Sequence, residues 1–134
     1  MSEYSLKNCT ILITGITDAG SLALAVAKQA KKEGAELVCT GLGLTPYHTN
    51  LSDKAKAYLE KTFSDFKETI AKELGANTLT LPLDVTIDAS IEEAANALSQ
   101  KGIKLNGLLH SIAMDKTIRA GAVKPLIEVT REEF

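Results

Sequence analysis

The stretch CTILITGITDAGSLALA, residues 9–25, joins an apolar run to a glycine and then to a run of strong helix formers. Its first six residues are nearly all apolar or β-branched, which is typical of a parallel strand covered on both faces. Gly15 ends that run, and small alanines then recur where a helix would approach a sheet. The stretch therefore predicts a strand, a glycine turn and a helix, which together begin an α/β fold.

The rest of the chain repeats this alternation of strand-length and helix-length segments. Further strands are expected at residues 35–40, 78–85 and 105–112, and helices at 21–33, 52–74 and 91–101. We expect Asp88 or Ser90 to cap the last helix, with Ala94, Ala95 and Leu98 facing inward. The pattern predicts an open, doubly wound parallel sheet of Rossmann type, a three-layer α/β/α arrangement with strand order 3-2-1-4 and an incomplete C-terminal half.

Composition excludes several classes of protein. The 134 residues suit one domain, and 15 basic against 17 acidic side chains give a net charge of -2. No broad positive surface is available for nucleic acid or anionic lipid, and no apolar stretch approaches a membrane span of about 20 residues. The start of the chain carries no apolar signal segment. We therefore expect a cytoplasmic protein without nucleic-acid or membrane partners.

Cysteines and histidines offer little reactive chemistry on sequence grounds. Cys9 and Cys39 form no CxxC pair and lie in apolar runs, so we expect buried free thiols. His48 stands isolated in a loop, and His110 near the end of a strand is interpreted as satisfied by a backbone bond rather than as a proton relay. With no third ligand near either histidine, no metal site is expected.

The junction between the first strand and the first helix is the strongest functional signal. A strand that ends in Gly15 and turns directly into a helix is expected to present bare amide hydrogens to a phosphate. Ser21 would add a hydroxyl donor, while Asp18 is interpreted as restraining the loop through an Asx turn. Because the fingerprint G-x-G-x-x-G is absent, this turn alone leaves dinucleotide binding undecided.

The ends of the other strands extend the candidate site. Asp84 is suited to accept a hydrogen bond from an adenine amino group beside a backbone contact of Val85, or it is a plain turn residue before Thr86. The small Ala113 would let a nicotinamide ring lie close. The second strand ends in a Thr-Gly-Leu-Gly run without the acid or arginine that reads a ribose, which favours NADH over NADPH.

Short motifs in the same order resemble one known family. They are TG at residues 14–15 with SLA at 21–23, EGAEL at 33–37, LDVT at 83–86, DASI at 88–91, NG at 106–107, HSIA at 110–113 and TREEF at 130–134. Together they resemble the N-terminal half of the NADH-dependent enoyl-acyl-carrier-protein reductases, which are divergent short-chain dehydrogenases. The similarity covers the chain except for residues 42 to about 57, a loop-helix insertion.

This resemblance implies a set of binding residues. Its cofactor positions are the pyrophosphate side (Gly15, Ser21, Leu22), the adenosine end (Leu42, Asp84, Val85), and the ribose and nicotinamide (Ile112, Ala113). Met114 and Asp115 occupy positions that line the family's acyl pocket. The implied reaction is reduction of a trans-2-enoyl thioester on acyl carrier protein, in fatty acid biosynthesis, with NADH as hydride donor.

The family's catalytic tyrosine and lysine, in a Tyr-x6-Lys pattern, have no counterpart at a strand end here. Tyr47 and Lys54 have that spacing but lie in the insertion. We therefore expect residues 1–134 to be the N-terminal part of a single NAD-binding Rossmann domain, without catalytic residues.

The helix start expected at Thr130 indicates a fragment of a longer chain. A homo-oligomer is expected through exposed apolar edges. The alternative is a non-catalytic nucleotide-binding or self-associating module.

Overall fold

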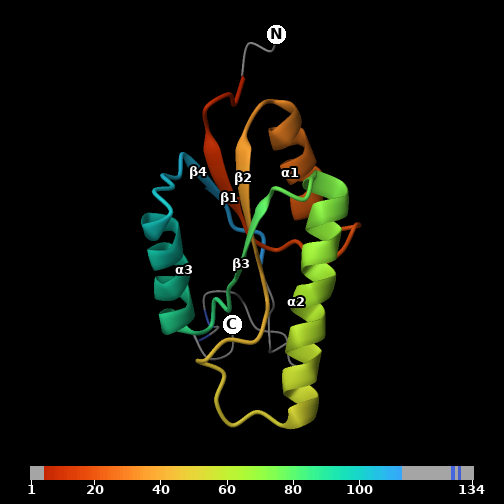
Figure 1. Cartoon of the computed structure of the whole chain (residues 1–134), viewed down its shortest axis with the longest axis vertical. Coiled ribbons are helices and arrows are strands. Elements are labelled where there is room, and N and C mark those ends of the chain that lie inside the picture. The colour runs from red at the N-terminus through yellow and green to blue at the C-terminus, as the bar shows by residue number, and fades with distance from the viewer. Residues whose placement is uncertain (1–4, 113–127, 129, 131–134) are drawn as a thin grey trace.

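A four-stranded parallel sheet organises the computed structural model, which describes residues 5–112, 128 and 130 (Figure 1). The elements in chain order are β1 (Thr10–Ile13), α1 (Leu22–Lys32), β2 (Glu36–Gly41), α2 (Asp53–Leu74), β3 (Leu79–Pro82), α3 (Asp88–Gln100) and β4 (Gly107–Leu109). The strand order is β3-β2-β1-β4, which confirms the expected order. The chain reverses its direction of winding between β1 and β4, so those two strands flank the switch point.

The sheet is covered on both faces because its strands alternate between two clusters of buried side chains. Ile13 and Cys39 lie in the cluster formed with α1 and α2, whereas Val38 lies in the cluster formed with α3. Figure 1 shows the same division, with α1 and α2 on one side and α3 on the other. Burial of both faces explains why the strands read as continuous apolar runs.

Several element boundaries differ from the sequence prediction. β3 ends at Pro82 on an edge of the described sheet, where the missing N–H of proline removes no ladder bond, since the Leu83 amide still donates to the Gly41 carbonyl at 2.9 Å. β4 is only three residues long. α3 begins earlier than expected, with Ile87 as its N-cap, so neither Asp88 nor Ser90 caps it. Ser90 is instead buried and accepts a hydrogen bond from the Asp84 amide at 3.0 Å.

The predicted inward face of α3 and the predicted thiols are confirmed in part. Leu98 is buried and Ala94 is half-buried, but Ala95 is exposed. Cys39 is fully buried and Cys9 half-buried, and both are free. Burial raises the pKa of the Cys39 thiol to about 12, which makes it an unreactive core residue.

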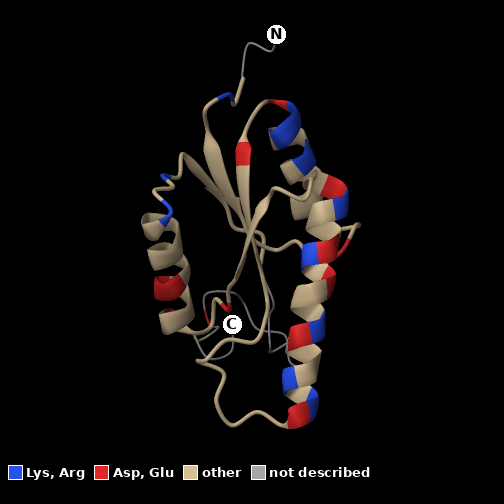
Figure 2. Ribbon diagram, viewed as in Figure 1, with Lys and Arg blue, Asp and Glu red and all other residues tan. Residues whose placement is uncertain are grey.

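Charged residues lie mostly on the helices, and almost none lie on the strands (Figure 2). On α2, Lys61 and Asp65 pair at 2.7 Å, four residues apart on the exposed surface. A second pair, Lys28 with Glu73 at 2.6 Å, joins α1 to α2, and this contact holds the pKa of Glu73 below its ordinary value. The lysines of α2 are all exposed and form a solvated face. Within the described part of the chain, no helix combines the length and apolarity that crossing a membrane requires.

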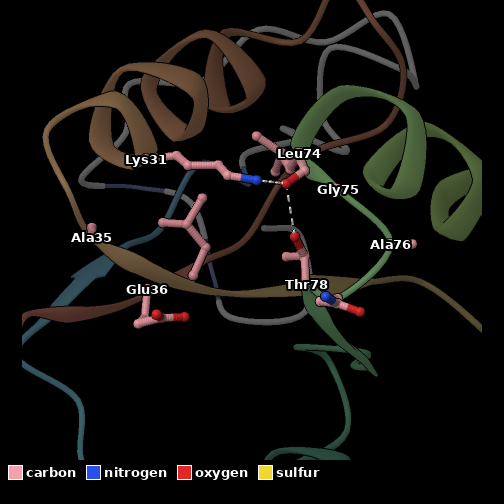
Figure 3. A pocket seen from close by; sticks show the side chains of 9 residues that line it. Lys31, Ala35, Glu36, Leu74, Gly75, Ala76 and Thr78 are labelled. Carbon is pink, nitrogen blue, oxygen red and sulfur yellow. Dashed lines mark hydrogen bonds between the residues drawn. The ribbon is translucent and has the colours of Figure 1, made fainter.

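The ends of α1 and α2 meet over a hollow of about 190 Å³ at the amino edge of the sheet, away from the strand ends considered below. Figure 3 shows Lys31 reaching from α1 to the carbonyl of Leu74, with the Thr78 hydroxyl directed at the same oxygen. The last carbonyls of a helix lack intrahelical donors and carry partial negative charge. A cation and a hydroxyl thus complete the end of α2.

Replacing Lys31 with methionine keeps the aliphatic stem and removes this cation. We expect Lys31→Met to lower the free energy of unfolding by about 1 kcal/mol. The matched control is Lys32→Met, one residue along the same turn, which is expected to change stability by less than about 0.5 kcal/mol. Urea denaturation followed by circular dichroism measures both, and equal losses would contradict the assigned role of Lys31.

Candidate functional site

Thr14 ties the carboxyl ends of β1 and β4 together. Its side chain is 2% exposed, its N–H donates to the Leu109 carbonyl at 3.0 Å, and its Oγ1 accepts from the Ser111 amide at 3.0 Å. The same oxygen lies 3.1 Å from Nδ1 of His110. His110 is therefore satisfied by a side chain rather than by the backbone bond that the sequence predicted.

Gly15 brings the turn after β1 against the end of β4. Its φ is +89°, a left-handed conformation that side chains rarely adopt. A Cβ built on Gly15 would collide with the backbone carbonyl of Ser111. The added Cβ is fixed to the backbone of residue 15, and the Ser111 carbonyl is itself backbone. Neither can therefore move aside as the end of a flexible side chain would. Only glycine fits at this position.

The turn between Gly15 and α1 is closed by its own side chains. Ser21 Oγ accepts from the amides of Thr17 at 2.9 Å and Asp18 at 3.0 Å. Asp18 Oδ1 accepts from the Gly20 amide at 2.8 Å, which confirms the predicted Asx turn. The Ser21 amide also donates to the Asp18 carbonyl at 3.2 Å. The expectation of a wholly bare bend is therefore wrong, because four of its amides already have acceptors.

Donors for an anion remain one step further along, at the first turn of α1. The amides of Leu22 and Ala23 have no hydrogen-bond acceptor among the described residues, and the Leu22 side chain is 82% exposed. Both lone pairs of Ser21 Oγ are used by the two amides, so its O–H is left to donate, either to Thr17 Oγ1 at 3.0 Å or to a ligand. Two helix amides and one hydroxyl can thus bind an anion.

Asp84 follows β3 and accepts three hydrogen bonds. Its Oδ1 accepts from the amide of Thr86 at 2.9 Å and from the hydroxyl of Thr86 at 2.6 Å, and Oδ2 lies 2.9 Å from Nε2 of His48. Burial raises the pKa of the Asp84 carboxyl, but these hydrogen bonds outweigh burial and leave the pKa below its ordinary value of 3.8. Asp84 is thus a turn residue that carries a full negative charge at neutral pH.

His48 is not isolated, contrary to the sequence prediction. It lies in the loop between β2 and α2 and contacts Asp84, 36 residues further along the chain. The signal for this contact was available: β2 and β3 are parallel neighbours, so the segments that follow them leave the sheet at the same edge. Among the described residues, no group of three or more His, Cys, Asp or Glu side chains is arranged to hold a metal ion.

The remaining predicted site residues are distributed along the same edge. Leu42 directly follows β2 and is 40% exposed, Val85 is half-buried after Asp84, and Ile112 is 38% exposed beyond β4. Gly15 is in contact with Ser111, the neighbour of Ile112, whereas Asp84 is joined to the loop of His48. Ala113, Met114 and Asp115 lie outside the described residues.

Comparison with known proteins gives matches to a family model, to relatives in sequence and to solved structures. A family model described as Enoyl-(Acyl carrier protein) reductase matches residues 15–134. The NADH enoyl-[acyl-carrier-protein] reductase FabI of Haemophilus influenzae is 36% identical over 103 residues, which are 77% of this chain and 32% of that protein. FabI of Buchnera aphidicola is 35% identical over 108 residues, 81% of this chain and 35% of its own. The chain thus spans about a third of these relatives.

A solved structure of similar shape is the FabI-NADH complex from Alistipes finegoldii. It superposes with a TM-score of 0.60 at 27% identity, over 87% of this chain and 35% of its own length. This similarity, over most of the chain, confirms the expected Rossmann-like fold.

Alanine substitutions at two glycines with positive φ distinguish the loss of stability caused by backbone strain from the loss caused by a steric collision. Gly102, at φ +68°, faces open space where a Cβ would stand, so Gly102→Ala is expected to cost about 1–2 kcal/mol of stability from strain alone. Gly15→Ala adds the collision with Ser111 and is expected to cost about 3 kcal/mol or more. Chemical denaturation measures both, and equal losses would show that the turn after β1 does not pack against the end of β4.

The depressed pKa of Asp84 has a consequence for stability. A carboxyl whose pKa is lower in the folded than in the unfolded chain stabilises the fold above its unfolded pKa. We therefore expect Asp84→Asn to cost about 1.5–3 kcal/mol at neutral pH. The difference from the unaltered chain is expected to shrink as pH falls below 3.8 and through the folded pKa. Unfolding curves measured between neutral and acidic pH test this, and a difference that stays constant would contradict it.

Proposed function

The chain belongs to the enoyl-(acyl carrier protein) reductase family, and from this premise we propose that it forms the cofactor-binding part of an NADH-dependent enoyl reductase of fatty acid biosynthesis. The observation that carries the proposal is the pair of unbonded amides, Leu22 and Ala23, beside a hydroxyl that can only donate. They lie at the switch point of a parallel sheet, where dinucleotides bind. The relatives named above are NADH enoyl reductases, and one structure is a complex with NADH.

The diphosphate bridge of NADH fits the first turn of α1. Its oxygens would accept from the free amides and from the Ser21 hydroxyl, and the partial positive charge of the helix end favours the anion. α1 has no acidic residue in its first turn that would repel a phosphate. Gly15 contributes by lacking a side chain, because the backbone of the turn then leaves open the space toward β4.

The two ends of the cofactor are assigned to the neighbouring strand ends. Asp84 would accept from the adenine amino group, since Oδ2 still has one unfilled acceptor position, and Val85 and Leu42 would line the adenosine side. Ile112 and Ala113 would border the ribose and nicotinamide. Met114 and Asp115 are proposed to line the pocket of the enoyl thioester carried by acyl carrier protein.

The proposed reaction adds a hydride to the β-carbon and a proton to the α-carbon of a trans-2-enoyl thioester. Bound NADH would supply the hydride. The chain's own residues would bind and orient the cofactor, and we propose that a tyrosine and a lysine outside these 134 residues stabilise the developing enolate. Tyr47 and Lys54, which have the matching spacing, flank the start of α2 rather than the ends of β1 and β4. The chain alone is therefore expected to bind NADH without reducing an enoyl thioester.

Leu22 offers a test in which stability and binding change in opposite directions. A glutamate at this exposed first-turn position favours the helix dipole, so Leu22→Glu is expected to raise stability by about 0.3–1 kcal/mol. The same carboxylate would repel the diphosphate, and we expect NADH to bind roughly tenfold more weakly or worse. Titration followed by nicotinamide fluorescence gives the dissociation constant.

The matched control for this test is Leu22→Gln, which has the same shape without the charge and is expected to bind NADH nearly as well as the unaltered chain. If Leu22→Glu and Leu22→Gln bind NADH equally, the diphosphate does not lie at the start of α1. If the unaltered chain binds no NADH at all, the chain is a module of another kind and the proposed function fails.

A further inference from the structure

His48 has both of its ring nitrogens engaged. Nδ1 lies 3.0 Å from the backbone amide of Thr45 and 3.0 Å from the Thr45 hydroxyl, and Nε2 lies 2.9 Å from Oδ2 of Asp84. The side chains of His48 and Asp84 are only 9% and 16% exposed. The ring therefore forms a bridge from the loop after β2 to the residue that follows β3.

These contacts fix which nitrogen carries the proton. A backbone N–H can only donate, so Nδ1 must accept from Thr45 and have no proton of its own. In this geometry the ring proton is on Nε2, and the neutral imidazole donates it to the Asp84 carboxylate. The carboxylate therefore keeps its full negative charge, which a cationic partner would partly neutralise.

The carboxylate is left with one acceptor position. An ionised aspartate offers about four lone-pair positions, and this chain fills three of them with Thr86 and His48. The unfilled position is on Oδ2, the oxygen that His48 contacts. Because His48 and Thr86 hold both oxygens, the direction of that position is fixed by the fold rather than by a freely rotating side chain.

We propose that His48 is a positioning residue that sets the base specificity of the cofactor site, by fixing the Asp84 carboxylate to accept from an amino group. The inference rests on the proposed function. A purine that carries an amino group at its six-position can donate to this fixed acceptor. A purine that carries an oxygen there presents an acceptor to an anion, and the two repel each other. His48 lies in the loop at 42–57, outside the short motifs that carry the resemblance to the reductase family.

The test compares two reduced dinucleotides, NADH and its hypoxanthine analogue, in which an oxygen replaces the adenine amino group and the neighbouring N1 carries a proton. Dissociation constants are measured by nicotinamide fluorescence for the unaltered chain, His48→Leu and the conservative His48→Gln. Tyr47→Phe is the matched control in the same loop, because Tyr47 is 41% exposed and only its backbone amide bonds to Thr45. Thermal unfolding of each variant confirms that it folds.

The quantity that decides is the ratio of the two dissociation constants. We expect the unaltered chain and Tyr47→Phe to prefer NADH by about tenfold or more, as one hydrogen bond to a charged group provides. In His48→Leu the preference is expected to fall below about threefold, and His48→Gln, which can still donate to Asp84, is expected to restore part of it. A role confined to folding would weaken both ligands equally and leave the ratio unchanged.

Each contrary result identifies what is wrong. An unchanged ratio in His48→Leu overturns the inference, and a larger ratio overturns it too, because it would mean that His48 competes with the amino group for Asp84. If the unaltered chain binds both dinucleotides equally well, the proposed function stands, but Asp84 does not accept a hydrogen bond from the adenine amino group. A chain that binds neither dinucleotide refutes the proposed function, and the inference with it.

Discussion

The contact between Gly15 and the backbone of Ser111 is the constraint on which the rest of this molecule depends. It joins the turn after β1 to the end of β4, the two strands between which the chain reverses its winding direction. Thr14 reinforces the contact from the adjacent position by bonding to both Leu109 and Ser111. Because no side chain fits between these backbones, α1 begins close beside the switch point, and its first amides are placed where a ligand of such a sheet lies.

The backbone amides at the turn into α1 fall into two groups: some donate to side chains of the turn itself, and others are free to donate to a ligand. The side chains of Ser21 and Asp18 satisfy three amides, which fixes the loop without any ligand present. The amides of Leu22 and Ala23 have no such acceptor among the described residues. A loop held in place by its own side chains, with these two helix amides free to donate, is preorganised, since little further ordering is needed when an anion binds.

Much of the fold follows from the sequence because both faces of the sheet are covered. Continuous apolar runs predicted all four strands, and strong helix formers between glycines predicted the three helices. The lengths of β3 and β4 were overestimated, because apolar residues continue beyond the paired ones, as at Leu105 before β4 and Ile112 after it, both of which are exposed. The start of α3 was missed because Ile87 caps it without a side-chain hydrogen bond, so no polar residue marks the boundary.

The site was predicted less completely than the fold. Gly15 and Asp84 follow strand ends and Ser21 lies at the start of α1, as expected. The side chains that would face a ligand also bond to the protein itself, a competition that spacing alone does not reveal. His48 was missed because its partner is distant in sequence and becomes a neighbour only through the pairing of β2 with β3.

Binding of a diphosphate at the first turn of α1 is the central claim. Its most direct test is amide NMR of the isotope-labelled chain during titration with NADH and, separately, with reduced nicotinamide riboside, which lacks the diphosphate. The Leu22 and Ala23 amide signals are expected to move with saturation on addition of NADH and to stay in place with the riboside. Unmoved Leu22 and Ala23 signals in a chain saturated with NADH would contradict the claim.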